Sequence, residues 1–323
     1  MSLSSARHRD VITLGEVLAI FLSSDGVPLE RSTRFDLTVA GAEANVAVGL
    51  VRLGHEVSFV GRVGDDALGR RTVRELRGEG VDTTGVVVDA SRTTGLIVRD
   101  APAVGATEVV YHRRGSAGSA LCVDDLDLAT IGDSRLLHVT GITAALSPTA
   151  HEACMTAMRT ARDAGVTVSF DPNVRRRIGT REQWTSLVEE AAVLADIVLV
   201  GADDASYALP VHDLDGVDGW FRERGVDTVV WKDGARGAVE INPRDGSVVQ
   251  PALSVPVRDA VGAGDAFAAG WISGWLDDED ASTRLHRGAA AAASVVATLG
   301  DLPGLPDRSA LTALLDPTTE MRR

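Results

Sequence analysis

Short apolar runs alternate with longer segments of helical periodicity along most of the chain. Six short runs rich in β-branched residues predict strands: Val11–Leu14, Val57–Val60, Leu136–Thr140, Val166–Phe170, Ile197–Val200 and Thr228–Trp231. Seven longer segments, in which apolar residues recur every three to four positions, predict helices: Ala42–Leu53, Leu68–Glu79, Thr149–Ala164, Glu182–Leu194, Gly219–Arg224, Asp265–Trp275 and Thr283–Thr298. Strands and helices that alternate in this way are typical of an α/β fold, with a mostly parallel central sheet and helices on both faces.

Three further segments do not follow this alternation, and they predict a small second sheet. Polar and apolar residues alternate over Arg34–Val39. Two more runs resemble the arms of a hairpin: Gly95–Arg99 and Glu108–Arg113. The turn between these two runs contains Pro102 and Gly105. We therefore expect a small β-sheet lid, with its strands inserted at about residues 17–40 and 92–115.

Composition and charge narrow the class of protein. The chain has 323 residues, of which 45% are hydrophobic and 24% charged, as in ordinary globular proteins. Without internal repeats or a long linker, the sequence predicts one domain over residues 10–316. A net charge of −14 repels nucleic acids and anionic membranes, so neither is an expected partner. The first nine residues lack the apolar core of a signal peptide, and Cys122 and Cys154 show no metal or redox spacing, which predicts a cytoplasmic protein.

A glycine-rich turn before a predicted helix carries the strongest chemical signal. Gly262, Ala263 and Gly264 lead directly into Asp265 and an apolar helix. The first N–H groups of a helix are unpaired and bind anions, and glycines let them approach a phosphate closely. A carboxylate held beside such a site is suited to take a proton from an attacking hydroxyl. A phosphate-binding site and a base together are what phosphoryl transfer to an alcohol requires. Taken alone, the stretch is also compatible with a glycine turn and an acidic N-cap.

A second motif near the start of the chain supports the phosphoryl-transfer interpretation. Small residues around Gly41 and Ala42 precede Asn45, whose amide can both donate to and accept from a hydroxylated ligand. Together with the run Gly61–Gly69, the two motifs resemble the two signatures of the ribokinase-like (PfkB) sugar kinases. This resemblance implies Asp265 as catalytic base, and an anion hole formed by residues 262–264. It also implies a β lid over the sugar that often mediates a homodimer or a higher homo-oligomer.

Two groups of arginines indicate the class of sugar. The segment 171–177 follows a predicted strand and ends in Arg175, Arg176 and Arg177, while the predicted lid carries Arg113 and Arg114. Ligands of open α/β sheets bind beyond the carboxyl ends of the strands. The guanidinium fork matches the two oxygens of a carboxylate, so arginines beside the sugar crevice favour an acid. We expect Arg113 and Arg175 to contact the acid, and the other three to be solvated or to serve the phosphates of ATP.

Further motifs resemble the 2-keto-3-deoxygluconate kinases. They are the run from Tyr111 to Ser119, the segment 140–148 and the pair Gly300-Asp301. By this resemblance Gly41, Ala42 and Asn45 bind sugar hydroxyls, Tyr111 and Arg113 reach in from the lid, Arg175 meets the acid end, and Asp301 lies near the substrate. Three positions depart from the family pattern: Ala40, Ile97 and Ala260.

The same resemblance places ATP along the second half of the chain. Its implied contacts are Asn173, Asp204, Lys232, Gly234, Ala235, Gly237, Gly262 and Gly264. The segment Gly201-Ala202-Asp203-Asp204 stands where the family has Asn-X-X-Glu, so the carboxylate is one methylene shorter. We expect Mg²⁺ to be held mainly by nucleotide phosphates and water, with no metal site built from protein side chains. The sequence leaves open whether a monovalent cation such as K⁺ is also needed.

The predicted activity is ATP-dependent phosphorylation of a primary hydroxyl of a sugar acid, with 2-keto-3-deoxygluconate as the leading candidate. Two alternatives stay open on the sequence. One is a kinase for a neutral sugar such as fructose or ribose, or for a nucleoside. The other is a sugar-binding module that keeps the fold without the chemistry.

Overall fold

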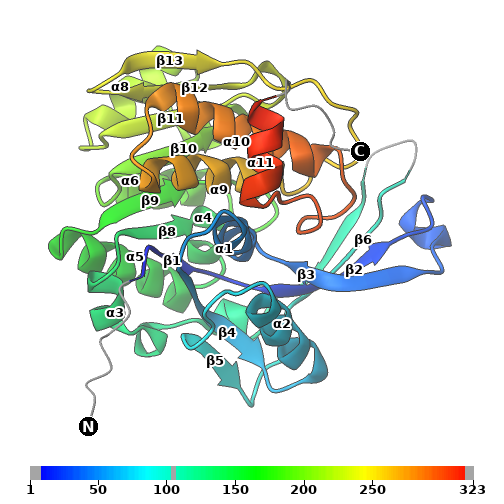
Figure 1. Ribbon diagram of the computed structural model, residues 1–323. Coiled ribbons are helices and arrows are strands. Elements are labelled where there is room, and N and C mark those ends of the chain that lie inside the picture. The colour runs from blue at the N-terminus through cyan, green and yellow to red at the C-terminus, as the bar shows by residue number, and fades with distance from the viewer. Residues whose placement is uncertain (1–8, 103–106, 317–323) are drawn as a thin grey trace, which may run out of the picture.

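The computed structural model describes residues 9–102 and 107–316 of the chain. Within these residues one large sheet of nine strands forms the centre of the molecule, in the order β13-β12-β11-β10-β9-β8-β1-β4-β5 (Figure 1). Its strands are β1 (Val11–Leu14), β4 (Val57–Gly64), β5 (Val86–Asp89), β8 (Leu136–Thr140), β9 (Thr167–Asp171), β10 (Ile197–Gly201), β11 (Thr228–Lys232), β12 (Ala238–Asn242) and β13 (Gly246–Gln250). The strands from β5 to β11 are parallel, and β12 and β13 extend the sheet antiparallel at one edge.

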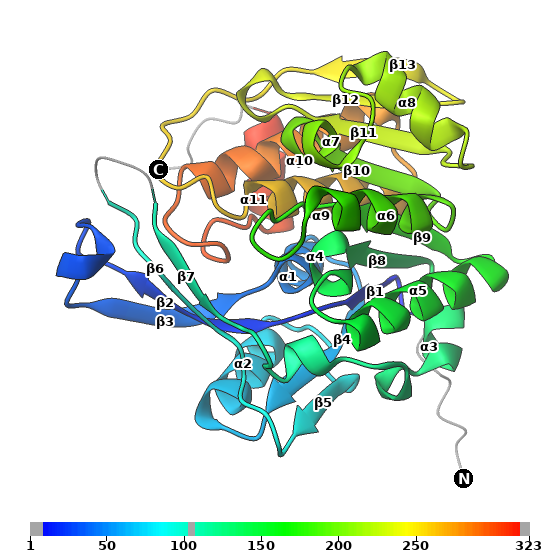
Figure 2. The same cartoon turned by 180° about the vertical axis from the view of Figure 1, so that it is seen from behind.

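Helices cover both faces of the large sheet. On one face lie α1 (Ala42–Arg52), α2 (Ala67–Gly78), α9 (Ala263–Leu276), α10 (Ala281–Val296) and α11 (Arg308–Leu315). The other face, turned to the viewer in Figure 2, carries α3 (Leu128–Gly132), α4 (Gly141–Ala144), α5 (Pro148–Asp163), α6 (Arg181–Ala192), α7 (Ala202–Ala208) and α8 (Leu214–Arg222). Short 3₁₀ turns are η1 (Leu29–Arg31), η2 (Gly118–Ala120), η3 (Val123–Asp125) and η4 (Gly234–Arg236).

Alternate residues of each central strand pack into different cores. In β1, Ile12 and Leu14 join the core under α5 and α6, while Val11 joins the core under α1, α9 and α10. In β10, Val198 and Val200 face the first core, and Ile197 and Leu199 face the second. Burial on both faces explains why these strands are continuous apolar runs in the sequence.

A second sheet forms the lid, which extends away from the large sheet (Figure 2). Its order is β3-β2-β6-β7, with β2 (Leu18–Ser23) and β6 (Leu96–Arg99) parallel and with β3 (Phe35–Ala40) and β7 (Val109–His112) antiparallel to them. A small apolar cluster packs on one face of this sheet: Leu18, Ile20, Ala40 and Ile97.

The α/β fold and the lid predicted from the sequence are confirmed. The predicted start of α8 at Gly219 is wrong, because the side chain of Asp213 caps the helix and accepts a hydrogen bond from the Gly216 N–H. The sequence pattern also missed β5, β12 and β13, and the turn at Gly105 lies outside the described residues. In the described part of the chain, no helix is long and apolar enough to cross a membrane.

Candidate active site

The N-terminus of α9 provides the proposed anion site. Gly262 is its N-cap and adopts a left-handed φ of 82°, so that Asp265 is the third residue of the helix. The N–H groups of Gly264 and Asp265 donate to no acceptor among the described residues. A Cβ atom on Gly262 would lie 3.3 Å from the Cα of Asp301. Glycine at this position therefore allows both the left-handed turn and the close approach to Asp301.

Asp265 is buried, and its carboxylate accepts hydrogen bonds from two asparagines. Asn45 Nδ2 donates to Oδ2 at 2.8 Å, and Asn173 Nδ2 lies 3.5 Å from Oδ1. Burial is the main cause that raises the pKa of Asp265 to about 7, with smaller opposing contributions from the Asn45 hydrogen bond and the charge of Arg175. A general base works best when its pKa is close to the working pH, so this pKa suits proton removal from an alcohol.

Asn45 reaches Asp265 because α1 begins at a close backbone contact. Gly41 is the N-cap of α1, with a φ of 149°, and a Cβ on it would lie only 2.4 Å from the carbonyl oxygen of Glu16. Asn45 lies one turn into α1, and its Oδ1 atom is buried without a hydrogen-bond partner among the described residues. The amide thus holds the base with one end and leaves an acceptor for a ligand hydroxyl at the other.

Glu43, on the same turn of α1, is a buried carboxylate that sequence reasoning missed. It accepts hydrogen bonds from the hydroxyls of Thr140 at 2.8 Å and Thr143 at 2.7 Å. Burial raises the pKa of Glu43 to about 7, and the charge of Asp265 acts in the same direction. Its bonds link α1 to the carboxyl end of β8, and thereby fix the helix that carries Asn45.

Asp301 lies beside the base and is paired with an arginine from the lid. Its Oδ2 atom is 3.4 Å from Asn45 Nδ2, and its Oδ1 atom accepts from Arg99 Nη2 at 2.9 Å. The same Arg99 nitrogen lies 2.8 Å from Oδ2 of Asp259. Burial acts to raise the pKa of Asp259, but Arg99 and two backbone N–H groups outweigh it and hold that pKa below its usual value.

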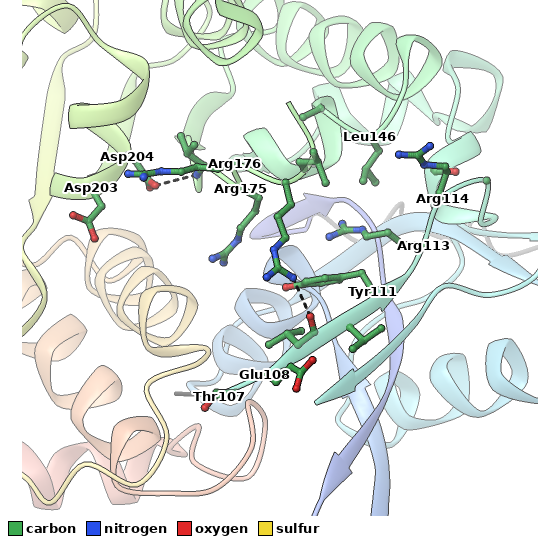
Figure 3. Close-up of a pocket in the computed structure, with 18 residues that line it drawn as sticks. Thr107, Glu108, Tyr111, Arg113, Arg114, Leu146, Arg175, Arg176, Asp203 and Asp204 are labelled. Carbon is green, nitrogen blue, oxygen red and sulfur yellow. Dashed lines mark hydrogen bonds between the residues drawn. The ribbon is translucent and has the colours of Figure 1, made fainter. Parts of the chain in front are cut away.

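An open pocket of about 940 Å³ lies between the lid and the large sheet. Tyr111, Arg113 and Arg114 line it from the end of β7, and Arg175 and Arg176 line it from the loop after β9 (Figure 3). These five residues bring two chain segments of the predicted sugar crevice into one space. Asp265 does not line this pocket, although the charge of Arg175 acts on its carboxylate.

The arginines of this pocket have different partners. Arg113 forms an ion pair with Glu16, a buried carboxylate after β1 that also accepts a hydrogen bond from the Ser116 hydroxyl. Arg177 donates to the carbonyl oxygen of Val109 at 3.2 Å, so it ties the lid to the body and is not simply solvated, as the sequence had suggested. The Arg175 side chain makes no hydrogen bond or ion pair with any described residue. Of the two arginines expected to contact the acid, Arg175 is therefore the one that is not already paired.

The predicted nucleotide residues lie along the carboxyl ends of β9, β10 and β11. Lys232 Nζ is 2.5 Å from Oδ2 of Asp171, and it is also 4.0 Å from the position of a Cβ on Gly264. Its positive charge thus lies beside the first turn of α9. Burial raises the pKa of Asp204 to about 6, with Asp171 adding to the effect.

The structure requires glycine at one position of the β11–β12 loop for packing, but not at another. Gly237 has a φ of 106°, and a Cβ on it would lie 2.1 Å from the carbonyl oxygen of Gln250, so its contact with β13 already demands glycine. Gly234 has a φ of 54° and no atom within 4 Å of its missing Cβ, and Ala235 follows it in the turn η4. The open space at Gly234 is the part of this loop that can receive a ligand.

Comparison with known proteins identifies the family. The model of the pfkB family carbohydrate kinases matches residues 9–308. The chain belongs to this family. The 2-dehydro-3-deoxygluconokinase of Thermoproteus tenax is 36% identical over 305 residues, which are 92% of this chain and 91% of that relative. The enzyme of the same name from Bacillus subtilis (strain 168) is 34% identical over 309 residues, 95% of each chain.

A solved structure supports the same assignment. The PfkB protein from Polaromonas sp. JS666 is 37% identical, with a TM-score of 0.87 over 94% of this chain and 99% of that one. As a PfkB carbohydrate kinase, the protein catalyses ATP-dependent phosphoryl transfer to a carbohydrate.

The structure brings eight of the predicted site residues of this kinase into two groups. Around the base lie Asn45, Asn173, Asp265 and Asp301, and around the pocket lie Tyr111, Arg113, Arg175 and Asp204. Sequence reasoning missed Glu16, Glu43, Arg99, Asp171 and Asp259 as parts of the site. Asp171 is the last residue of β9 and Glu16 follows β1, and polar residues at the carboxyl ends of parallel strands are a signal that could have found them. Arg99 gives no such signal, because its partners lie far away in the sequence.

Proposed function

We propose that this PfkB carbohydrate kinase phosphorylates a primary hydroxyl of a sugar acid, with 2-keto-3-deoxygluconate as the leading substrate. The observation that carries the proposal is the unpaired guanidinium of Arg175, which lines the 940 Å³ pocket and acts electrostatically on Asp265. A cation with no protein partner is suited to a carboxylate, because the pair gains two charge-assisted hydrogen bonds. The names of the Thermoproteus and Bacillus relatives support the same class of substrate.

The remaining sugar contacts follow from the geometry of the crevice. Asn45 offers its free Oδ1 atom to a hydroxyl, and Gly41 and Ala42 form the close backbone turn in front of it. Tyr111 is 40% exposed at the pocket edge, with the guanidinium of Arg113 over its ring at 5.4 Å. Asp301 is proposed to accept a further sugar hydroxyl beside the base.

The proposed mechanism uses Asp265 as the general base. ATP supplies the phosphoryl group, and Mg²⁺ on its phosphates offsets their negative charge. One carboxylate oxygen of Asp265 takes the proton of the sugar hydroxyl. At the same time the hydroxyl oxygen forms its bond to the γ-phosphorus, and the bond from that phosphorus to the ADP oxygen breaks. The N–H groups of residues 262–264 are proposed to stabilise the negative charge on the transferring group, which can approach Gly262 and Gly264 without a side chain in the way. Of these groups, the Ala263 N–H also donates to the Ala260 carbonyl oxygen at 3.4 Å.

The nucleotide is proposed to lie on the other side of α9. Lys232 carries positive charge to the α9 N-terminus, and Asn173 and Asp204 lie at the adjacent strand ends. Gly234, Ala235 and Gly237 form the turn after β11, and Gly262 and Gly264 face the phosphates. The unpaired N–H groups and the lysine fit a polyphosphate. Asp204 and water are proposed to contact the Mg²⁺ shell, with nucleotide phosphates as its main ligands.

A neutral sugar such as fructose or ribose is the alternative substrate, with a nucleoside behind it. Two observations favour it. Glu16 neutralises Arg113, which removes one of the two predicted carboxylate partners, and Ile97 presents an apolar side chain in the lid core. A sugar-binding module without turnover is disfavoured, because the base and the open helix N-terminus are both intact.

The deciding experiment measures ADP release with Mg·ATP and 2-keto-3-deoxygluconate, fructose, ribose or a nucleoside at equal concentrations. Turnover only with the acid supports the proposal, and turnover only with a neutral sugar contradicts it. We expect Arg175→Ala to raise KM for the acid by about 10- to 100-fold, the worth of a lost charge-assisted hydrogen bond. Arg114→Ala, which changes another arginine of the same pocket, is the matched control, and equal effects of both changes would argue against a specific carboxylate contact.

Four expectations beyond the substrate remain predictions. Residues 10–316 are proposed to act as one kinase domain, which limited proteolysis tests. A homodimer or higher homo-oligomer through the lid is tested by light scattering, and a cytoplasmic location by cell fractionation. The need for a monovalent cation such as K⁺ is tested by assays in KCl against choline chloride.

A further inference from the structure

Arg99 is a charged side chain buried in the lid that the reaction as described so far does not use. It is the last residue of β6 and is only 1% exposed. Ile97, two residues earlier on the same strand, is also buried, so both side chains point from β6 toward the inside of the molecule. An arginine is almost never buried so completely unless carboxylates compensate its charge.

Two carboxylates from the catalytic half of the chain compensate this charge. Arg99 Nη2 lies 2.8 Å from Asp259 Oδ2 and 2.9 Å from Asp301 Oδ1. Its Nε and Nη1 atoms are buried without a hydrogen-bond partner among the described residues. The hydrogen bonds of this guanidinium therefore all leave the lid, and they converge on two acids that are 42 residues apart in the sequence, since 301 − 259 = 42.

Asp259 holds the loop that leads to the anion site. Its Oδ1 atom accepts from the N–H of Val261 at 3.1 Å, which fixes the turn just before Gly262. Its Oδ2 atom accepts from the N–H of Gly300 at 3.1 Å, which ties this loop to the segment carrying Asp301. The carboxylate thus keeps three donors in one arrangement: Val261, Gly300 and Arg99.

Asp301 connects the same cation to the base. Its second oxygen is 3.4 Å from the Asn45 amide, which in turn donates to Asp265. The backbone of Asp301 also packs within 3.3 Å of the place where Gly262 lacks a Cβ. A shift of Asp301 would therefore disturb both the base and the N-cap of α9.

We propose that Arg99 is a positioning residue, which links the lid sheet to the catalytic loop by holding Asp259 and Asp301 together. The link rests on the proposed roles of Asp265 and of the 262–264 amides. Without the guanidinium, two buried carboxylates would face each other with no cation between them, and both would move apart or take up protons. The loop and the base would then leave the geometry needed for transfer, and a misplacement of about 1 Å can cost about 10²-fold in rate.

The test compares Arg99→Ala, Arg99→Lys and Arg99→Met with the matched control Arg284→Ala. Arg284 is a second buried arginine that pairs with two acids, Glu240 and Asp245, but it contacts the opposite end of α9 at Gly274. We expect kcat of Arg99→Ala to fall about 10²-fold. Guanidinium ion at about 50 mM should restore it at least tenfold by filling the vacated cavity, and Arg99→Lys should keep more activity than Arg99→Met. Arg284→Ala should lose stability but keep kcat within about threefold.

Two results would overturn the proposal. One is a kcat of Arg99→Ala within about threefold of the wild type. The other is a loss of kcat that guanidinium does not restore and that Arg284→Ala shares. If Arg99→Ala does not fold, Arg99→Met decides in its place, and a kcat within about threefold of the wild type refutes the role. The substrate is whichever sugar the wild-type kinase turns over, so a failure of the sugar-acid proposal leaves this comparison intact.

Discussion

Replacing Asp265 with asparagine should have opposite effects on activity and on stability. The carboxyl is buried, and burial raises its pKa from 3.8 to about 7. Such a group binds its proton more tightly in the folded state than in the unfolded state. Its contribution to stability therefore falls as the pH rises above the unfolded pKa, and levels off above the folded pKa. An asparagine of nearly the same shape does not ionise and escapes this loss.

The size of the effect follows from the two pKa values. A shift from 3.8 to about 7 corresponds to about 4 kcal/mol at pH 8, but to less than about 2 kcal/mol at pH 5. The advantage of Asp265→Asn over the wild type should therefore grow by about 2 to 3 kcal/mol between pH 5 and pH 8. The cost of burying an amide is the same at every pH, so it shifts the whole curve and leaves this growth unchanged.

Urea unfolding of both proteins at pH 5, 6, 7 and 8 and constant ionic strength measures this difference. Asp127→Asn is the control, because hydrogen bonds from Thr130 hold the pKa of Asp127 below its usual value. Its carboxyl is therefore ionised in both the folded and the unfolded state above pH 5, and the stability difference between wild type and this amide variant should stay constant from pH 5 to pH 8. At pH 8 the kcat of Asp265→Asn should fall by about 10²- to 10⁴-fold. If the difference in unfolding free energy between Asp265→Asn and the wild type stays constant with pH, the reasoning is refuted. Such a result would mean that the pKa of Asp265 is not raised in the folded protein.

Two further predictions test the surroundings of the site. Asn45→Ala removes a hydrogen bond that lowers the pKa of Asp265, so the acidic limb of kcat/KM should move to higher pH; a limb that stays in place or moves down would contradict the bond. Gly237→Ala should destabilise the protein by several kcal/mol more than Gly234→Ala, which should cost about 1 kcal/mol in chemical unfolding, because only at Gly237 would the new Cβ meet the Gln250 carbonyl. Equal losses would show that the contact with β13 does not require glycine at that position.

The central strands were predictable because burial on both faces of the sheet leaves a short continuous apolar run in the sequence. β1 and β8 have the bounds that the sequence predicted, since each is a short apolar run buried on both faces. The start of α9 was also predictable to within two residues, because glycines before an apolar helix have few other uses. The pattern of apolar residues is weaker in β12 and β13 at the sheet edge, and these two strands could not be predicted from it.

The candidate site was predictable only where its residues are adjacent in the sequence. Asp265 and its glycines are adjacent in the chain, so their joint role is visible in the sequence. Arg99 is 202 residues from Asp301, and it comes from a lid strand that is otherwise apolar. The pairing of Arg113 with Glu16 also joins different elements that lie far apart in the sequence. Such pairs depend on how the lid meets the large sheet, which the order of residues does not reveal.

Most of the cationic side chains expected to bind ligands in this crevice already form ion pairs with buried acids. The sequence argument treated Arg113 and Arg175 alike, as two cations for one carboxylate. In the structure Arg113 forms an ion pair with Glu16, and Lys232 forms one with Asp171. Arg99 forms ion pairs with both Asp259 and Asp301. Each of these acids is buried, so releasing its cation to a ligand would leave an uncompensated buried charge, at a cost of several kcal/mol. Of the two arginines that the sequence predicted to contact the acid, only Arg175 forms no ion pair with a carboxylate of the described residues, so we expect selectivity for an acid to depend on it.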